Sequence, residues 1–78
     1  MHRVRLLHAE GCHLCERACK IVAEVCGELG IAFQTIDIAG DPELEARYRE
    51  WFPVVEVDGE RAFVYHVPAD ALRRRLAR

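Results

Sequence analysis

Apolar residues between His13 and Leu29 recur every three or four positions, which is the spacing of one face of an α-helix. Charged residues such as Arg17 and Glu24 occupy the opposite face, as in a helix that packs one side on a core. Gly30 follows at once, and glycine in this place is typical of a helix C-terminus. The pattern predicts a helix over residues 13–29 with an inward stripe of Cys15, Ala18, Cys19, Val22, Val25, Cys26 and Leu29.

Two short segments flank this helix and predict β-strands. Residues 3–8 take their apolar content from Val4, Leu6 and Leu7, and residues 32–38 are rich in residue types with high β-propensity. A helix between two neighbouring strands connects them in parallel, and such crossovers are right-handed. The first half of the chain therefore predicts a β-α-β unit, whose helix starts at the carboxyl end of a strand. Ligand sites in open α/β sheets gather at that end.

Two further helices are indicated by residues at their starts. Asp41-Pro42 has the form of an N-cap followed by proline at the first helical position, which predicts a short helix to about residue 49. Pro68 and Asp70 begin a final helix. The residues of this last helix that we expect to face inward are Leu72 and Leu76.

The dipeptide Asp58-Gly59 joins strand candidates at residues 54–57 and 60–65, and it strongly favours a two-residue hairpin turn. A hairpin is antiparallel, whereas the first two strands are expected to be parallel. The element order β-α-β-α-β-β-α therefore predicts an α/β fold with a mixed four-stranded sheet flanked by helices. We expect a single domain over residues 1–78.

Composition and charge argue against several classes of function. The formal net charge of −2 at pH 7 gives no basic footprint for nucleic acid or for anionic lipid. No apolar run approaches membrane-spanning length, and residues 1–11 lack the apolar stretch of a signal peptide. We therefore expect a cytoplasmic monomer. In that reducing compartment, a close cysteine pair is catalytic or metal-binding more often than structural.

The segment Cys12-His13-Leu14-Cys15 lies where the first strand gives way to the long helix. Residues three apart on a helix can form a disulfide, because their Cα atoms lie roughly 5–6 Å apart. The positive end of the helix dipole favours a thiolate over a thiol in the first turn. This pattern indicates a dithiol–disulfide redox switch.

The two cysteines are expected to have different roles. Cys12 lies at or just before the first helical turn, so its thiolate is placed to attack a substrate disulfide, while Cys15 lies on the apolar stripe and resolves the mixed disulfide. Two alternatives stay open: thiols without a function, and a metal-binding or redox-sensing module that uses Cys12, Cys15 and Cys19 without turnover. Because the sequence has no second CxxC motif and no HxxxH motif, we expect no bound metal.

The remaining cysteines and two of the histidines carry a weaker signal. Cys19 and Cys26 lie two helical turns apart, too far for a disulfide, and are interpreted as buried small hydrophobic residues. Cys19 also lies one turn from the redox pair, where it is a candidate auxiliary thiol. His8 and His66 are interpreted as surface or sheet residues.

Two neighbours of the first cysteine are charged or titratable. His13 either stabilises the thiolate of Cys12 as a partial cation or is an exposed polar residue of the first turn, because adjacent helical side chains diverge. Glu10 opposes thiolate formation through its like charge. The sequence leaves both readings of His13 open.

Over essentially its whole length, the chain resembles the thioredoxin superfamily and, in particular, a bacterial group of small glutaredoxin-like proteins. The resemblance rests on Gly-Cys-His-Leu-Cys-Glu at residues 11–16, on Phe52-Pro53-Val54 before the third strand, and on the hairpin that follows. In this superfamily the proline before the third strand is cis and packs beside the active-site cysteines. The resemblance therefore implies a thioredoxin-like fold, a cis Pro53, and a backbone at Phe52 that pairs with substrate as an added strand.

The resemblance also implies the activity of a thiol–disulfide oxidoreductase that acts on protein disulfides or glutathione mixed disulfides. No cofactor is implied, although glutathione is a candidate reductant. Glutaredoxins usually carry Cys-Pro-Tyr-Cys, and a Gly-Gly-x-Asp segment after the hairpin that binds glutathione, whereas residues 64–68 of this chain read Val-Tyr-His-Val-Pro. Both glutathione and protein disulfides therefore stay open as partners. The residues expected to contact substrate beside the cysteines are Gly11, His13, Leu14, Phe52 and Pro53.

Overall fold

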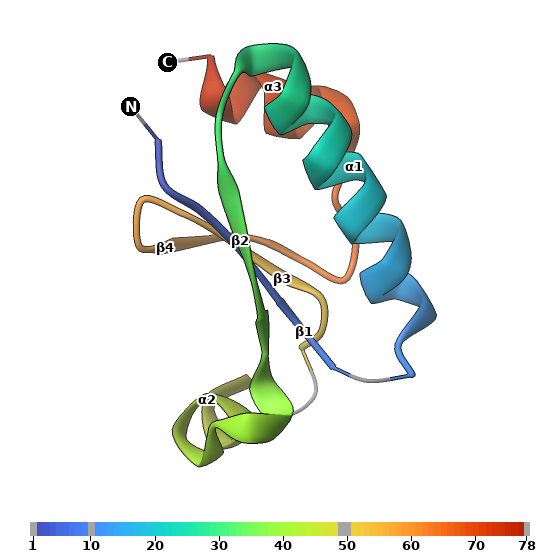
Figure 1. Ribbon diagram of the computed structural model, residues 1–78, viewed down its shortest axis with the longest axis vertical. Coiled ribbons are helices and arrows are strands. Elements are labelled where there is room, and N and C mark those ends of the chain that lie inside the picture. Colours follow the sequence, from blue (N-terminus) through green and yellow to red (C-terminus); the bar gives the residue numbers. More distant parts are fainter. Residues whose placement is uncertain (1, 10, 49–50, 78) are drawn as a thin grey trace.

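The computed structural model describes residues 2–9, 11–48 and 51–77 of the chain. Four strands form one mixed sheet, in the order β2-β1-β3-β4 (Figure 1). β1 pairs in parallel with β2 and antiparallel with β3, and β3 pairs antiparallel with β4. The strands are β1 (Val4–His8), β2 (Phe33–Asp37), β3 (Val54–Val57) and β4 (Glu60–Val64); the helices are α1 (His13–Leu29), α2 (Pro42–Tyr48) and α3 (Ala69–Leu76), with a short 3₁₀ turn η1 (Ile38–Gly40). The predicted α/β architecture and element order are confirmed.

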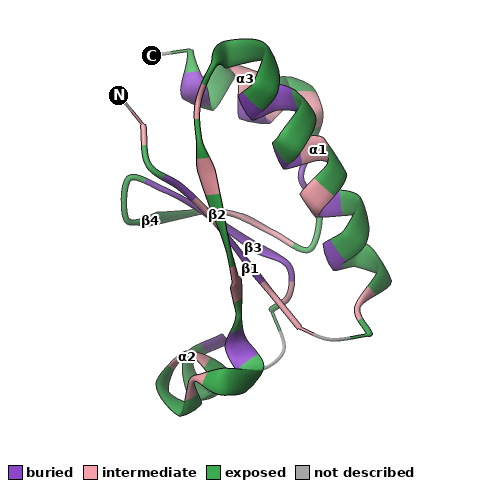
Figure 2. Cartoon of the chain, viewed as in Figure 1, coloured by how far each residue is buried: buried purple, intermediate pink, exposed green. Residues whose placement is uncertain are grey.

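The two faces of the sheet are covered by different helices. Val4 and Leu6 of β1 pack in one apolar cluster with residues of α1 and α3. Leu7, the next residue of the strand, packs in a second cluster with Tyr48 of α2. Because side chains alternate between the faces of a strand, α1 and α3 lie on one face and α2 on the other. Figure 2 shows the buried positions along the inner sides of these elements.

Local sequence signals explain most element boundaries. Asp41 caps α2 through its Oδ1, which accepts the backbone N–H groups of Glu43 and Leu44 at 3.0 and 3.2 Å. Asp58 and Gly59 both have positive φ, as a type I′ hairpin turn requires. The predicted helix starts and the predicted hairpin are therefore confirmed.

The C-terminal end of α1 departs from the predicted inward stripe. Leu29 is 42% exposed, so its expected burial is wrong. The reason is the cap: Gly30 adopts a left-handed conformation, and the N–H of Ile31 donates to the carbonyl of Cys26 at 2.9 Å. This turn brings Ile31, in place of Leu29, against the core.

Strand ends and one short turn also differ from the expectation. β1, β2 and β4 are each shorter than the segments 3–8, 32–38 and 60–65. The apolar Ile38 was expected to end a strand, but it is buried in η1 instead. Asp37 causes this early end, because its Oδ1 accepts the N–H of Ala39 at 2.9 Å and thereby starts the 3₁₀ turn.

Helix α3 supports α1 from the side. Arg73 of α3 donates two hydrogen bonds to the carboxylate of Glu28 in α1, at 2.8 and 2.9 Å, and one to Asp70 at 2.7 Å. Leu72 and Leu76 face the core, as predicted. These contacts hold the C-terminal end of α1 against α3. The N-terminal end of α1 lies at the carboxyl end of β1.

Candidate active site

Cys12 and Cys15 form a disulfide at the N-terminus of α1, with their Cα atoms 5.2 Å apart. Cys12 is the N-cap residue: its backbone is extended, and its Sγ accepts the N–H of Cys15 at 3.1 Å. Gly11 precedes it with φ of 74°, a conformation that glycine adopts readily. The sulfur of Cys12 therefore occupies the place of the anion that a helix N-terminus stabilises.

The two cysteines differ in exposure. Cys15 is 4% exposed and Cys12 is half-buried, so a partner reaches Cys12 first. This asymmetry agrees with the division of labour expected from the sequence. Further along the helix, Cys26 is 1% exposed and burial raises the pKa of its thiol, which makes it an inert core residue as predicted.

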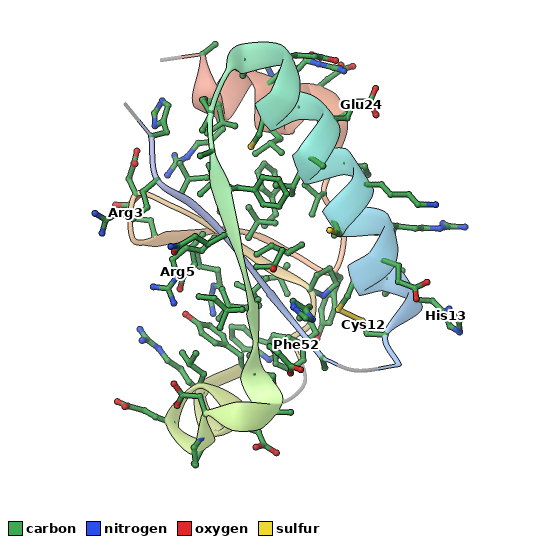
Figure 3. The ribbon with its side chains drawn as sticks, viewed as in Figure 1. Arg3, Arg5, Cys12, His13, Glu24 and Phe52 are labelled. Carbon is green, nitrogen blue, oxygen red and sulfur yellow. A yellow bond between two sulfur atoms is a disulfide. The ribbon has the colours of Figure 1, made fainter. Side chains whose placement is uncertain are left out.

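The residues between the two cysteines face solvent. The side chain of His13 is 96% exposed, and its Nδ1 lies 3.7 Å from a carboxylate oxygen of Glu16. Figure 3 shows His13 pointing outward, away from the sheet, while Cys12 lies on the side that faces it. Leu14 is 40% exposed. His13 is thus an exposed polar residue of the first turn, and its effect on Cys12 stays a prediction.

The Phe52–Pro53 peptide bond is cis, as the resemblance implies. Val54, the next residue, is the register partner of Leu7 in β1, so Pro53 lies at the end of the sheet where β1 leads to the cysteines. Figure 3 places Phe52 and Cys12 at this same end. The carbonyl of Pro53 accepts the N–H of Tyr65 at 2.9 Å, which holds the segment to the end of β4. Among the described residues, none forms a hydrogen bond with the backbone of Phe52.

A groove of about 350 Å³ opens beside the disulfide, between the first turns of α1 and the strands β1 and β2. His8, which sequence reasoning did not assign to the site, and Cys19, the candidate auxiliary thiol, both line this groove. His8 was read as a surface or sheet residue; it is half-buried at the end of β1. Cys19 was expected to be buried, but it is half-buried. The groove residues are Leu6, His8, Ala9, Gly11, Cys12, Cys15, Glu16, Cys19 and Thr35.

The spacing of His8 and Cys19 along the sequence indicates which face of its strand or helix each residue occupies. His8 follows Val4 and Leu6 at a period of two, so it shares the face of β1 that α1 covers. Cys19 lies four residues after Cys15, so the two share a helix face. The sequence pattern therefore predicts these two faces, whereas the groove between them depends on how α1 packs on the sheet.

Within residues 2–9, 11–48 and 51–77, no three His, Cys, Asp or Glu side chains are grouped so that they could hold a metal ion. The metal-binding alternative therefore stays a prediction without an observation in its favour. In the same described segments, no helix has the length and apolar character needed to cross a membrane. Glu10, expected to act on Cys12, lies outside the described residues.

Residues 3–77 match the family model described as "Glutaredoxin-like domain (DUF836)". The chain belongs to this glutaredoxin-like family. An uncharacterized protein of Mycobacterium tuberculosis is 36% identical over an alignment of 81 residues, which covers 97% of this chain and 84% of the relative. Sequence comparison therefore agrees with the predicted family over nearly the whole chain.

Solved structures show that this glutaredoxin-like protein has a thioredoxin-like fold. The protein XcR50 of X. campestris aligns with a TM-score of 0.78 at 28% identity, covering 95% of both chains. A chloroplastic thioredoxin z aligns with a TM-score of 0.81 at 16% identity, covering 99% of this chain and 76% of the other. The fold and a CxxC pair in disulfide geometry together fit a redox function.

Proposed function

We propose that this protein is a cytoplasmic thiol–disulfide oxidoreductase that reduces or exchanges protein disulfides or glutathione mixed disulfides. The observation that supports this most is the disulfide of Cys12 and Cys15 at the start of α1, with Cys12 half-buried and Cys15 buried. In the reduced protein, Cys12 is the nucleophile and Cys15 resolves the intermediate. The position of the Cys12 sulfur as N-cap supports a stabilised thiolate there.

The reaction proceeds in two exchanges. The thiolate of Cys12 attacks one sulfur of the substrate disulfide, forms a mixed disulfide, and releases the other sulfur as a thiolate. Cys15 then attacks the Cys12 sulfur, forms the Cys12–Cys15 disulfide, and releases the second substrate thiol. Two protein thiols are oxidised and one substrate disulfide is reduced, so no cofactor enters the exchange.

The backbone of Phe52 is proposed as a docking edge for an extended substrate. Pro53 is buried, Phe52 is half-buried beside the site, and the described residues supply no backbone partner for Phe52. An extended peptide adds to a sheet by pairing its backbone with the N–H and C=O groups at the sheet's edge. Gly11, His13 and Leu14 complete this surface on the cysteine side. A substrate disulfide held there would face Cys12.

Serine variants of the two cysteines test the assignment. Cys12→Ser is expected to lower reduction of a small disulfide by at least about 1,000-fold, because a hydroxyl does not replace the thiolate nucleophile. Cys15→Ser is expected to accumulate a mixed disulfide on Cys12, visible by mass spectrometry as an added substrate mass. As a matched control, Cys26→Ala removes a thiol from the core and should retain turnover. Full turnover by Cys12→Ser would contradict the proposal.

Equilibration with defined glutathione buffers separates the two substrate classes. Glutathione chemistry predicts a glutathionylated Cys12 in the mass spectrum of Cys15→Ser, together with turnover of a glutathione mixed disulfide by the native chain. A protein-specific enzyme instead shows turnover of a protein disulfide with little glutathionylation. If neither assay gives its product, the redox-sensing module without turnover is favoured instead.

A further inference from the structure

The groove beside the disulfide holds a titratable side chain to which the reaction above gives no role. His8 is half-buried at the carboxyl end of β1, on the strand face that α1 covers. It lines the same groove of about 350 Å³ as Cys12 and Cys15. An imidazole therefore faces the space next to the resolving cysteine.

The resolving step requires a proton acceptor at this place. Only a thiolate attacks a disulfide, so Cys15 must lose its proton before it displaces the substrate. Cys15 is 4% exposed, and burial of a thiol disfavours the charged form. Cys15 lines the groove, so a base in the groove lies on the same side of the protein as the cysteine that must lose its proton.

On the side of α1, two further titratable side chains face the groove. Glu16 is an exposed carboxylate, with 76% of its side chain accessible, and it lies 3.7 Å from His13. The free thiol of Cys19 also lines the groove. A carboxylate is a weak base at neutral pH, and a neutral thiol is a weaker proton acceptor than an imidazole. His8 is therefore better suited than Glu16 or Cys19 to accept the proton of Cys15.

On the side of the sheet, Asp37 of β2 is the register partner of His8. Its carboxylate accepts the N–H of Ala39 at 2.9 Å and starts η1, so it is engaged in the fold. Thr35, the other β2 residue at the groove, does not titrate near neutral pH. Glu10, a sequence neighbour, lies outside the described residues.

We propose that His8 is the general base that accepts the proton of Cys15 in the resolving step. The inference rests on the proposed function and adds a residue to it. The Cys15 S–H bond breaks, the proton passes to a ring nitrogen of His8, and the sulfur electron pair forms the bond to the Cys12 sulfur. The bond between Cys12 and the substrate sulfur breaks, and the departing thiolate takes a proton from the His8 imidazolium. Histidine suits this exchange because its ring gains and loses protons between about pH 5 and 8.

An aromatic disulfide whose released thiolate is coloured separates the two exchanges in one experiment. Reduced protein treated with dithiobis(nitrobenzoate) releases one coloured thiolate when Cys12 attacks and a second when Cys15 resolves. The parent, the test variant and the control all carry Cys19→Ser, so that the groove thiol does not contribute colour. The test variant is His8→Asn, and Glu16→Gln is the matched control at the same groove.

The proposal predicts that His8→Asn leaves the rate of the first release within about twofold of the parent protein. The second release is expected to slow by about 100-fold at neutral pH, the lower end of the usual range for general base catalysis. In the parent, the second rate rises with pH and levels off once the imidazole is neutral, whereas in His8→Asn it keeps rising until the thiol itself ionises. Glu16→Gln should keep both rates and the levelling.

A slowing of less than about tenfold, or a pH profile with the same shape in both proteins, would overturn the role of His8. An absent first release in the parent would instead contradict the proposed function itself. If His8→Asn does not fold, the parent protein decides: a second rate that keeps rising with pH until the thiol itself ionises overturns the inference.

Discussion

The two faces of the sheet are stabilised by different kinds of contact. On the face covered by α1 and α3, Leu6, Val22 and Leu72 are fully buried in an apolar cluster. On the face covered by α2, the hydroxyl of Tyr48 donates to Glu56 at 3.0 Å, and Arg5 lies 3.4 Å from the other carboxylate oxygen of Glu56. One face therefore depends on apolar packing, and the other adds a buried polar network.

Each face supports one half of the site. Helix α1 carries Cys12 and Cys15, while α2 precedes Phe52 and Pro53 in the chain and anchors to β3 through Tyr48. The apolar face therefore positions the sulfur chemistry, and the polar face positions the proposed docking edge. Changes on the two faces should affect different steps of the same reaction.

The largest effect is expected from the apolar face. Leu72→Ala should lower the free energy of unfolding by about 2–5 kcal/mol, because it removes a fully buried side chain and leaves a cavity between α3 and the sheet. Chemical denaturation followed by circular dichroism measures this loss. A change below about 1 kcal/mol would show that α3 is not an integral part of this face.

A smaller effect is expected from the polar face. Tyr48→Phe should cost about 1–3 kcal/mol of unfolding free energy, because the buried carboxylate of Glu56 loses a hydrogen-bond donor. The variant should raise KM for a protein disulfide substrate, while the alkylation rate of Cys12 stays as in the parent. If Tyr48→Phe weakened substrate binding and slowed the alkylation of Cys12 to the same extent, the separate roles of the two faces would be contradicted.

The native contact of Tyr48 also gives a pH dependence. Burial, and secondly the hydrogen bond to Glu56, raise the pKa of Tyr48 above its ordinary value. Its contribution is therefore complete below the ordinary tyrosine pKa of about 10 and is lost as pH rises through the folded value. The stability difference between the parent and Tyr48→Phe should narrow in alkali, which denaturation at neutral and alkaline pH will measure.

The smallest effect is expected at the hairpin, at the opposite end of β3 from Pro53. The N–H of Arg3, and secondly the ring of His2, hydrogen-bond to Asp58 and lower the pKa of its carboxyl group. Stability from this contact is present above the ordinary aspartate pKa of about 4 and is lost as pH falls through the lower folded value. Asp58→Asn should flatten the acid side of the stability profile and leave turnover unchanged. Altered turnover would show that the hairpin turn and the site are coupled.

Much of the fold follows from local signals in the sequence. The period of the α1 stripe, the Asp41 cap and the Asp58-Gly59 turn each specify an element through contacts within a few residues, and the structure retains all three. The exposure of Leu29 and the early end of β2 depend on how the chain turns after Gly30 and at Asp37. Such turns are set by capping geometry, which apolar periodicity does not report.

The site was predictable where its residues are adjacent in the chain. Cys12 and Cys15 lie within one helical turn, so spacing alone places their sulfurs together. Cys19 lies near them through the same helical spacing, whereas His8 of β1 meets them only through the packing of α1 on β1, and no local pattern encodes the resulting groove. The buried contact of Tyr48 with Glu56 likewise joins α2 to β3, and the sequence did not predict it.

The pH dependence of cysteine alkylation in the reduced protein tests the central claim most directly. Mass spectrometry after brief exposure to iodoacetamide identifies which sulfur reacts at each pH. The account predicts that Cys12 is modified first and Cys26 is protected. It also predicts that Cys12 stays reactive well below about pH 8.5, the usual pKa of a free cysteine thiol. A Cys12 rate that follows an ordinary thiol, or prior modification of Cys15, would contradict it.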